Sequence, residues 1–238
     1  MNILMGLLEI IPYGKKFLLE KYEDSNHAHR SWEHCFKSFQ IARLNDDYTN
    51  NKNKLCLELA FFLASWGMYR GSSFLVKKDY LVHQGVIDCI FKEEYRDLWS
   101  IPIEHIDKAA CDMIMSLRDE IENEYNRVRN RTNGVISDVL ITKVLMGTMG
   151  CVPAYDRYFI EGLKKCNIRP LHFSTKSLAA IVSTFYPYGN ELRKLKEPIY
   201  LDEKDEWHDD NHYYPDMKLI DMCIWQIGFV SEFQGFKK

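Results

Sequence analysis

Apolar residues recur with helical spacing along most of the chain. The longest such segment is 103–130, which turns wholly polar near its end, and its apolar positions follow one another at three- or four-residue intervals: Ile106, Ala110, Met113, Leu117 and Ile121. This spacing places them on one face of an α-helix. The stretch 54–68, KLCLELAFFLASWGM, is apolar almost all round, so it predicts a central helix that its neighbours cover on several sides.

Local start and stop signals predict the remaining helices. Ser31 is a good N-cap for a helix over 31–44, and the Asn- and Asp-rich segment 45–54 predicts a loop. Pro12 and Gly14 are expected to interrupt a helical pattern over 2–23. Other helices are expected over 76–94, 138–147, from Asp156 onward, over 174–186 after Ser174 or Thr175, and from Pro215 to a cap at Gly228.

No pair of alternating strands joined by a hairpin turn is visible. The flanks of Asn133-Gly134, the single candidate turn, suit helices better than strands. The sequence therefore predicts an all-α protein: a single helical domain over 1–238, a globular bundle of about ten helices, with a long acidic loop at about 196–216. A two-lobed arrangement of the bundle stays open.

Composition and charge narrow the classes of partner. The chain has 46% apolar residues among 238, enough for a substantial core, and its formal net charge of −3 offers no global attraction to nucleic acid. DNA or RNA would therefore need a local basic patch, for which Arg127, Arg129 and Arg131 are the candidates, although basic residues also suit the end of a helix.

The cysteines and the N-terminal segment predict a cytoplasmic protein without a membrane partner. The seven cysteines are scattered, with no C-x-x-C pair, which is typical of reduced thiols. The segment MNILMGLLEIIPYGKK has no basic start or small-residue cleavage site and carries Glu9, so neither a signal peptide nor a membrane anchor is expected.

The stretch 132–159 combines turn chemistry, an apolar helical run and a polar cluster. Asn133-Gly134 suits a left-handed turn, and Ser137 or Asp138 can cap the helix that follows. Cys151-Val-Pro-Ala then predicts an extended segment that leads to Asp156 at the start of another helix. Asp156 has a structural explanation as a cap or ion-pair partner, beside a role in binding or chemistry.

This pattern of a Gly134-Val135 turn, a helix, Val152-Pro153 and Asp156 resembles the helix-hairpin-helix region of base-excision DNA glycosylases of the 8-oxoguanine type. A second segment, 219–225, resembles a closing helix of uncharacterised bacterial proteins with a degenerate glycosylase-like fold. The resemblance implies that the turn binds DNA phosphate and that Asp156 is the catalytic carboxylate, which assists attack at the sugar. The nucleic-acid contacts that we expect are Arg127, Arg129, Arg131, Gly134, Ser137 and Arg157.

Two departures from the family pattern bear on activity. Ile136 replaces the second glycine of the hairpin, and Asp138 stands where bifunctional glycosylases carry a lysine nucleophile. Lys143 lies one to two helical turns onward and on a different face, which makes it a poor substitute. We therefore expect a protein that binds nucleic acid or a base and has no lyase activity. Two alternatives stay open: a protein-interaction or regulatory module, and a monofunctional glycosylase that uses Asp156.

Three further clusters have both a structural and a functional interpretation. Arg30 with His34 is similar to the Arg/His pair of HEPN ribonucleases but one residue too short, and His208 with His212 offers metal ligands within what reads as a solvated acidic loop. The turn 67–73 could hold a phosphate, but helix capping also explains its glycines and serines. The chain has no Walker motif, nucleophile elbow or dinucleotide fingerprint, so we expect neither a cofactor nor a metal.

Overall fold

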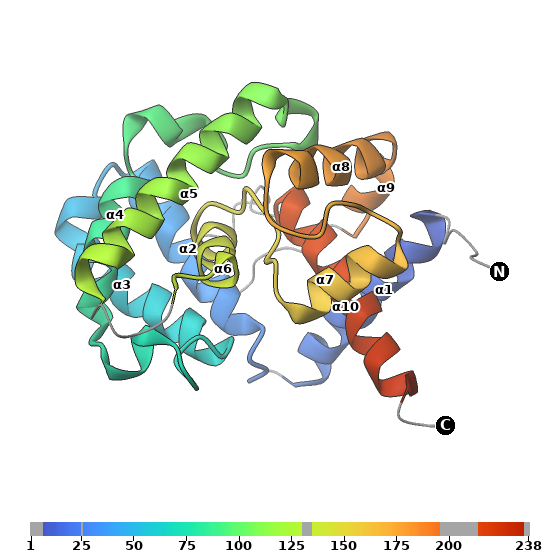
Figure 1. Cartoon of the computed structure of the whole chain (residues 1–238), viewed down its shortest axis with the longest axis horizontal. Helices are drawn as coiled ribbons and strands as arrows, with labels where there is room; N and C mark the ends of the chain where they lie inside the picture. Colours follow the sequence, from blue (N-terminus) through green and yellow to red (C-terminus); the bar gives the residue numbers. More distant parts are fainter. Residues whose placement is uncertain (1–6, 25, 130–134, 196–213, 236–238) are drawn as a thin grey trace.

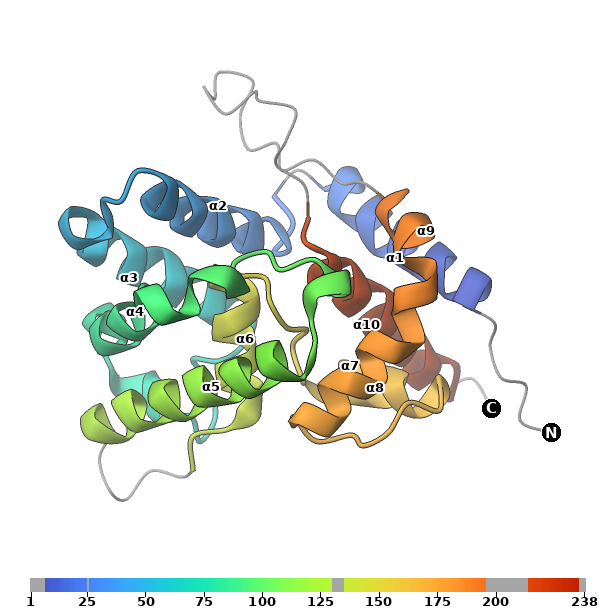
Figure 2. The same cartoon turned by 90° about the horizontal axis from the view of Figure 1, so that it is seen from above.

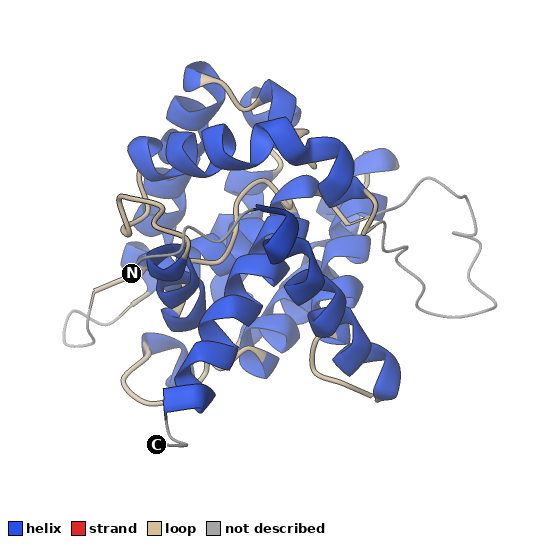
Figure 3. Ribbon diagram, turned by 90° about the vertical axis from the view of Figure 1, so that its right-hand side faces the viewer, coloured by secondary structure: helices blue, strands red, loops and turns tan. Residues whose placement is uncertain are grey.

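The computed structural model describes residues 7–24, 26–129, 135–195 and 214–235. This part of the chain is all-helical, without strands, and forms a single globular arrangement as predicted (Figure 3). Its α-helices are α1 (Leu7–Glu23), α2 (Arg30–Leu44), α3 (Tyr48–Ser65), α4 (Gln84–Ile90), α5 (Lys108–Val128), α6 (Asp138–Thr148), α7 (Arg157–Lys165), α8 (Thr175–Phe185), α9 (Gly189–Arg193) and α10 (Asp216–Gly235). Short 3-10 turns are η1 (Phe74–Lys77), η2 (Tyr80–His83), η3 (Glu93–Leu98), η4 (Ile103–His105) and η5 (Tyr186–Tyr188).

The helices fall into two groups that lie side by side (Figures 1 and 2). In the first group α3 packs against α2 and α6, and α4 packs against α5. In the second group α10 packs against α7, α1 and α9. The chain thus starts in the second group with α1, builds the first group, and returns with α7. One continuous cluster of buried apolar side chains extends through both groups.

Helix α10 is the buried centre of the second group. Every residue from Tyr214 to Ile224 is buried, including Lys218 and Asp221. The sequence predicted that 54–68 would be the most covered helix, but Leu57 and Phe61 of α3 are 55% and 56% exposed. The prediction was wrong because apolar residues around a helix do not by themselves show which faces its neighbours cover.

Two glycines allow α7 and α10 to touch through their backbones. A Cβ at Gly162 would lie 2.0 Å from the carbonyl oxygen of Ile224, and one at Gly228 would lie 1.9 Å from that of Tyr158. The expected helix end at Gly228 is therefore wrong: α10 continues to Gly235, and the glycine serves close packing instead of a cap.

Packing also overrides the expected break in α1. The helix continues through Pro12 and Gly14, although a proline removes one backbone donor. Gly14 faces α10, where an added Cβ would lie 2.6 Å from Cys223 Sγ. The glycine is thus a contact point between the two helices.

Three other boundaries differ from the predictions. Helix α2 begins one residue before Ser31, whose hydroxyl donates to the Ala28 carbonyl instead of capping. Helix α3 begins at Tyr48, so much of the predicted loop 45–54 is helical. The segment 76–94 is not one helix. Asp79 adopts an extended backbone conformation, and its carboxylate accepts the Leu81 N–H, so the chain is interrupted there and η2 begins.

None of the helices in the described ranges is long and apolar enough to cross a bilayer.

A buried histidine ties η2 to α5. The His83 side chain is fully buried, with Nδ1 2.8 Å from the Tyr125 hydroxyl and Nε2 2.9 Å from the Tyr69 hydroxyl. Burial lowers the pKa of His83 to about 3. The neutral imidazole is therefore part of the folded structure near neutral pH.

The glycine contact predicts that Gly162→Ala destabilises the protein by about 3 kcal/mol, the upper end of the usual cost of overpacking. The added methyl group would force α7 away from α10. Urea unfolding followed by circular dichroism measures this cost. Gly189→Ala is the control, because it makes the same chemical change at the start of α9, where the atom nearest to the added Cβ is a Glu104 side-chain oxygen at 3.3 Å. An equal loss of stability in Gly189→Ala would contradict the explanation.

Acid should destabilise the protein through His83. Because the folded-state pKa is about 3 and the unfolded value is about 6.5, the unfolded chain binds the proton more tightly, and stability falls as the pH drops from 6.5 towards 3. The shift sets an upper limit of about 5 kcal/mol on this loss. Urea titrations at several pH values should show a shallower acid dependence for His83→Gln than for the wild type, and no change for the exposed His34→Gln.

Candidate functional site

The two groups of helices meet at a cleft, here called the central cleft. It consists of two adjoining hollows of about 270 and 720 Å³ that share Trp66, Gly67, Arg70, Lys143, Asp156 and Tyr158. Trp66 follows α3 and Lys143 belongs to α6, whereas Asp156 and Tyr158 stand at the start of α7. The cleft is thus formed by segments far apart in the sequence.

Asp156 both caps α7 and faces the cleft. Its Oδ1 accepts the backbone N–H groups of Tyr158 and Phe159, each at 3.1 Å, which confirms the predicted cap. Its Oδ2 lies 3.6 Å from the Lys143 Nζ and accepts from the Trp225 Nε1 at 3.3 Å. The capping and the functional interpretations of this carboxylate are therefore compatible, because each oxygen has its own partners.

Lys143 places an amine beside Asp156, which the sequence did not predict. Its ammonium also donates to the Trp66 carbonyl at 2.9 Å, and its side chain is only 7% exposed. Asp138 pairs instead with Arg118 of α5 at 2.9 Å. Lys143 lies on another face of α6, and that face is directed at Asp156. Its role as a substitute nucleophile stays a prediction.

The chain reversal after α6 explains this meeting. Gly150 adopts a φ of +67°, and a Cβ there would lie 2.5 Å from Pro215 Cγ. The chain then returns beside α6, where the Tyr155 N–H donates to Thr142 Oγ1 at 3.0 Å. Residues 155 and 156 are thereby placed next to residues 142 and 143.

Aromatic rings form the walls of the cleft. Tyr158 and Trp225 meet edge to face with ring centroids 5.1 Å apart, and the Lys143 ammonium lies 5.7 Å from the centre of a Trp66 ring. His29, the residue before α2, also lines the cleft and stacks on Phe17 at 4.0 Å. Each of the rings of Trp66, Tyr158 and Trp225 is partly exposed, so a flat ligand could contact them.

Burial and the neighbouring carboxylates shift the pKa of Lys143 in opposite directions. Burial lowers the pKa of Lys143, Asp156 and Asp221 raise it, and Arg70 lowers it. The net direction is downward because the loss of hydration is the largest contribution. A lysine in this state has a larger neutral fraction near pH 7 than an exposed lysine, which is the form that attacks carbonyl carbon.

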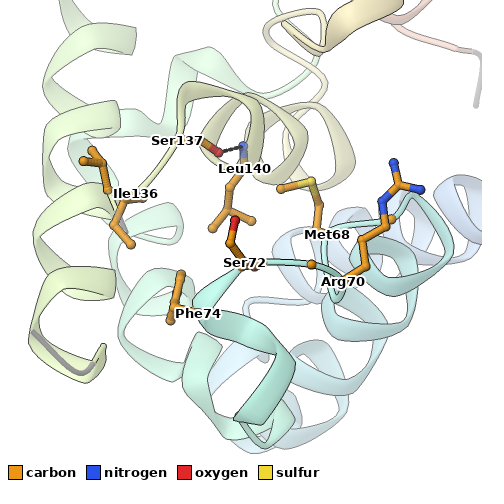
Figure 4. Close-up of a pocket in the computed structure, with 11 residues that line it drawn as sticks. Met68, Arg70, Ser72, Phe74, Ile136, Ser137 and Leu140 are labelled. Carbon is orange, nitrogen blue, oxygen red and sulfur yellow. Dashed lines mark hydrogen bonds between the residues drawn. The ribbon is translucent and has the colours of Figure 1, made fainter. Parts of the chain in front are cut away.

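A third hollow, of about 510 Å³, adjoins the central cleft and shares Gly67, Met68 and Arg70 with it. It is called the adjoining hollow below. Figure 4 shows its two walls, the turn 67–73 and the start of α6, with Ser137 bonded to the Leu140 amide. Ser137 is the N-cap of α6, as predicted. The hollow therefore faces the positive end of a helix dipole.

The predicted nucleic-acid contacts are not all together. Arg157 lines the central cleft and its guanidinium lies over the Tyr158 ring at 4.6 Å, while Ser137 lines the adjoining hollow. Arg127 pairs with Glu124 in a separate acidic hollow, and Arg129 lines neither the cleft nor the adjoining hollow. Arg131 and Gly134 lie outside the described residues. The role of each stays a prediction.

The other candidate clusters stay apart from the cleft. Arg30 pairs with Glu33 at 3.7 Å, and His34 is exposed, so neither joins Asp156. His208 and His212 lie outside the described residues. Across the ranges that are described, no three His, Cys, Asp or Glu side chains gather in a way that could hold a metal ion.

The sequence did not predict Trp66, Trp225 or Arg70 as site residues, and it indicated Lys143 only as a poor substitute nucleophile. One signal was available for Lys143: it is the single basic residue in VLITKVLMG, and a charge inside a buried helix must find a partner of opposite charge. No comparable signal marks the tryptophans, because an aromatic residue in a helical pattern usually belongs to the core.

No protein-family model, curated protein or solved structure matches this chain.

The two tasks of Asp156 predict different costs for two substitutions. Asp156→Ala removes both the cap and the carboxylate beside Lys143, whereas Asp156→Asn removes the carboxylate but keeps an oxygen for the cap. We expect the asparagine variant to be less stable than the wild type, and the alanine variant to lose at least about 1 kcal/mol more. Urea unfolding measures both, and Ser174→Ala, which removes the cap of α8 away from the cleft, gives the cost of a cap alone. Equal stabilities of the two Asp156 variants would contradict the cap, and an asparagine variant as stable as the wild type would contradict the ion pair.

Proposed function

We propose that the protein binds nucleic acid and holds one nucleobase in the central cleft. The observation that carries this proposal is the Lys143–Asp156 ion pair, 3.6 Å between Nζ and Oδ2, in a cleft walled by aromatic rings. Aromatic side chains stack on any base, and a base outside a duplex offers hydrogen-bonding edges to charged groups. The ion pair would fix the orientation of such a ring.

The adjoining hollow supplies a path for the phosphate backbone. It joins the cleft at Gly67 and Arg70 and holds the start of α6, where backbone N–H groups point outward. Arg157 also lines the cleft. A strand that followed this path would meet two arginines without crossing the acidic hollow that contains Arg127.

This path predicts which arginines contribute to binding. In salt titrations of a fluorescent single-stranded DNA, followed by anisotropy, Arg70→Ala and Arg157→Ala should each reduce the affinity and lower the salt slope by about 1. Arg127→Ala is the matched control and should leave both unchanged. If Arg127→Ala, alone or with Arg129→Ala and Arg131→Ala, reduces binding while the cleft variants do not, the strand follows the other route. Binding that does not depend on salt would contradict both routes.

Base excision is a second candidate, favoured by the amine beside the carboxylate. The expectation of no lyase activity depended on the lack of an amine, and Lys143 supplies one. In such a reaction the neutral amine attacks the C1′ aldehyde of an abasic site, water leaves, and an imine forms. Asp156 would stabilise the positive charge on that nitrogen. If Lys143 does not attack, Asp156 could still assist attack by water at the sugar, as in a monofunctional glycosylase.

Borohydride trapping distinguishes these chemistries. Borohydride reduces an imine to a stable amine, so wild-type protein incubated with abasic-site DNA should give a covalent adduct on a denaturing gel. Lys143→Met should abolish the adduct, Asp156→Asn should slow its formation, and Lys108→Met, which removes an exposed lysine, should not affect it. An adduct that persists in Lys143→Met, or no adduct in the wild type, would contradict a role for the Lys143 amine. In the latter case a damaged-base panel tests the monofunctional reaction, and inactivity there removes it.

A further inference from the structure

Three residues of α10 lie behind the Lys143–Asp156 pair. Lys218, Asp221 and Trp225 are spaced by three and four residues, so they share one face of the helix. Trp225 contacts Asp156 directly. Asp221 Oδ1 accepts the Ala154 N–H at 2.9 Å, two residues before Asp156, and Asp221 Oδ2 accepts from the Lys218 Nζ at 3.0 Å.

Lys218 and Asp221 are almost wholly enclosed, with side chains 2% and 1% exposed. The Lys218 ammonium lies 4.7 Å from a Trp66 ring centre, 5.1 Å from Trp32 and 5.3 Å from Phe17. Burying an ion pair among aromatic rings commonly stabilises a fold no more than apolar side chains of the same size would. A structural role therefore does not explain why two charges occupy this position.

The buried pair reaches both members of the cleft pair. Asp221 holds the Ala154 backbone and thus the segment that carries Asp156. Lys218 packs beneath Trp66, whose carbonyl oxygen accepts from Lys143. A change in either residue of the buried pair would therefore be transmitted to the cleft through one hydrogen bond or one ring.

We propose that Lys218 and Asp221 are positioning residues for the Lys143–Asp156 pair: Asp221 fixes the backbone that aims Asp156 and adds negative charge near Lys143, and Lys218 stabilises that charge on Asp221. This inference rests on the proposed function, because it takes Lys143 and Asp156 as the groups that act on the ligand. Neither Lys218 nor Asp221 lines the cleft, so their effect passes through other residues.

The charges predict shifts of the same sign. The groups around Lys143 are Asp156 and Tyr158 of the α7 start, Asp221 of α10, Arg70 of the 67–73 turn, and His29 before α2; Lys218 of α10 acts on Asp221, and Glu33 of α2 acts on Lys218. Asp221→Asn removes a negative charge that raises the pKa of Lys143, so this pKa should fall. Lys218→Met leaves Asp221 without its counter-ion, and because burial already raises the pKa of Asp221, the carboxyl takes up a proton and the same negative charge is lost.

Nuclear magnetic resonance of protein containing ¹³C-lysine tests this directly. The Cε–Hε signal of Lys143, identified by its loss in Lys143→Met, is followed from pH 5 to 11, with exposed Lys108 as the internal reference. We expect the pKa of Lys143 to be lower than in the wild type in both Asp221→Asn and Lys218→Met. Any other pattern overturns the proposal.

Folding is controlled for in the same experiment. Near-ultraviolet circular dichroism reports the packing of the aromatic rings around Lys218. If Lys218→Met does not fold, Lys218→Gln removes the charge but keeps an N–H for Asp221, and the same fall in the Lys143 pKa is required of it. Because no nucleic acid is present, failure of this test and failure of DNA binding are separate results.

Discussion

The burial of Lys143, Lys218 and Asp221, with the half-buried Asp156 beside them, is the constraint on which the rest of the structure depends. A charge inside a protein destabilises the fold unless a partner and hydrogen bonds replace its hydration. Lys143 meets this condition through Asp156 and the Trp66 carbonyl, and Lys218 meets it through Asp221 and three aromatic rings. These contacts link α3, α6, α7 and α10, so the groups that shape the cleft also connect the helices around it.

The close approach of α7 and α10 makes this arrangement possible. With Gly162 and Gly228 at the crossing, the two backbones touch, and the start of α7 lies against the face of α10 that carries Trp225. Side chains at the crossing would separate the helices by several ångströms, and the indole could then no longer reach Asp156. Two glycines distant from Lys143 thereby determine the geometry of the carboxylate beside it.

The sequence predicted elements whose signals are local. The predicted positions of α6, α7 and α8 agree with the structure, because Ser137, Asp156 and Ser174 each cap the helix that they precede. The predictions failed where contacts between distant segments decide the outcome, as at Pro12 in α1 and Gly228 in α10. The same holds for the candidate site. Asp156 could be predicted because it caps the helix that follows it, whereas the cleft around it depends on which helices meet in the folded structure.

The expected lack of an amine shows why position in a family pattern is an indirect guide to chemistry. Asp138 occupies the position where the resemblance to DNA glycosylases implies a lysine, but it has a structural partner in Arg118 that holds α6 against α5. The face of α6 that turns towards α7 instead carries Lys143, and the chain reversal at Gly150 brings Asp156 to it. A reaction depends on the distance between two groups and on their surroundings, and neither depends on how many residues separate them. The presence of an amine beside Asp156 is therefore a property of the fold, and the sequence pattern alone could not exclude it.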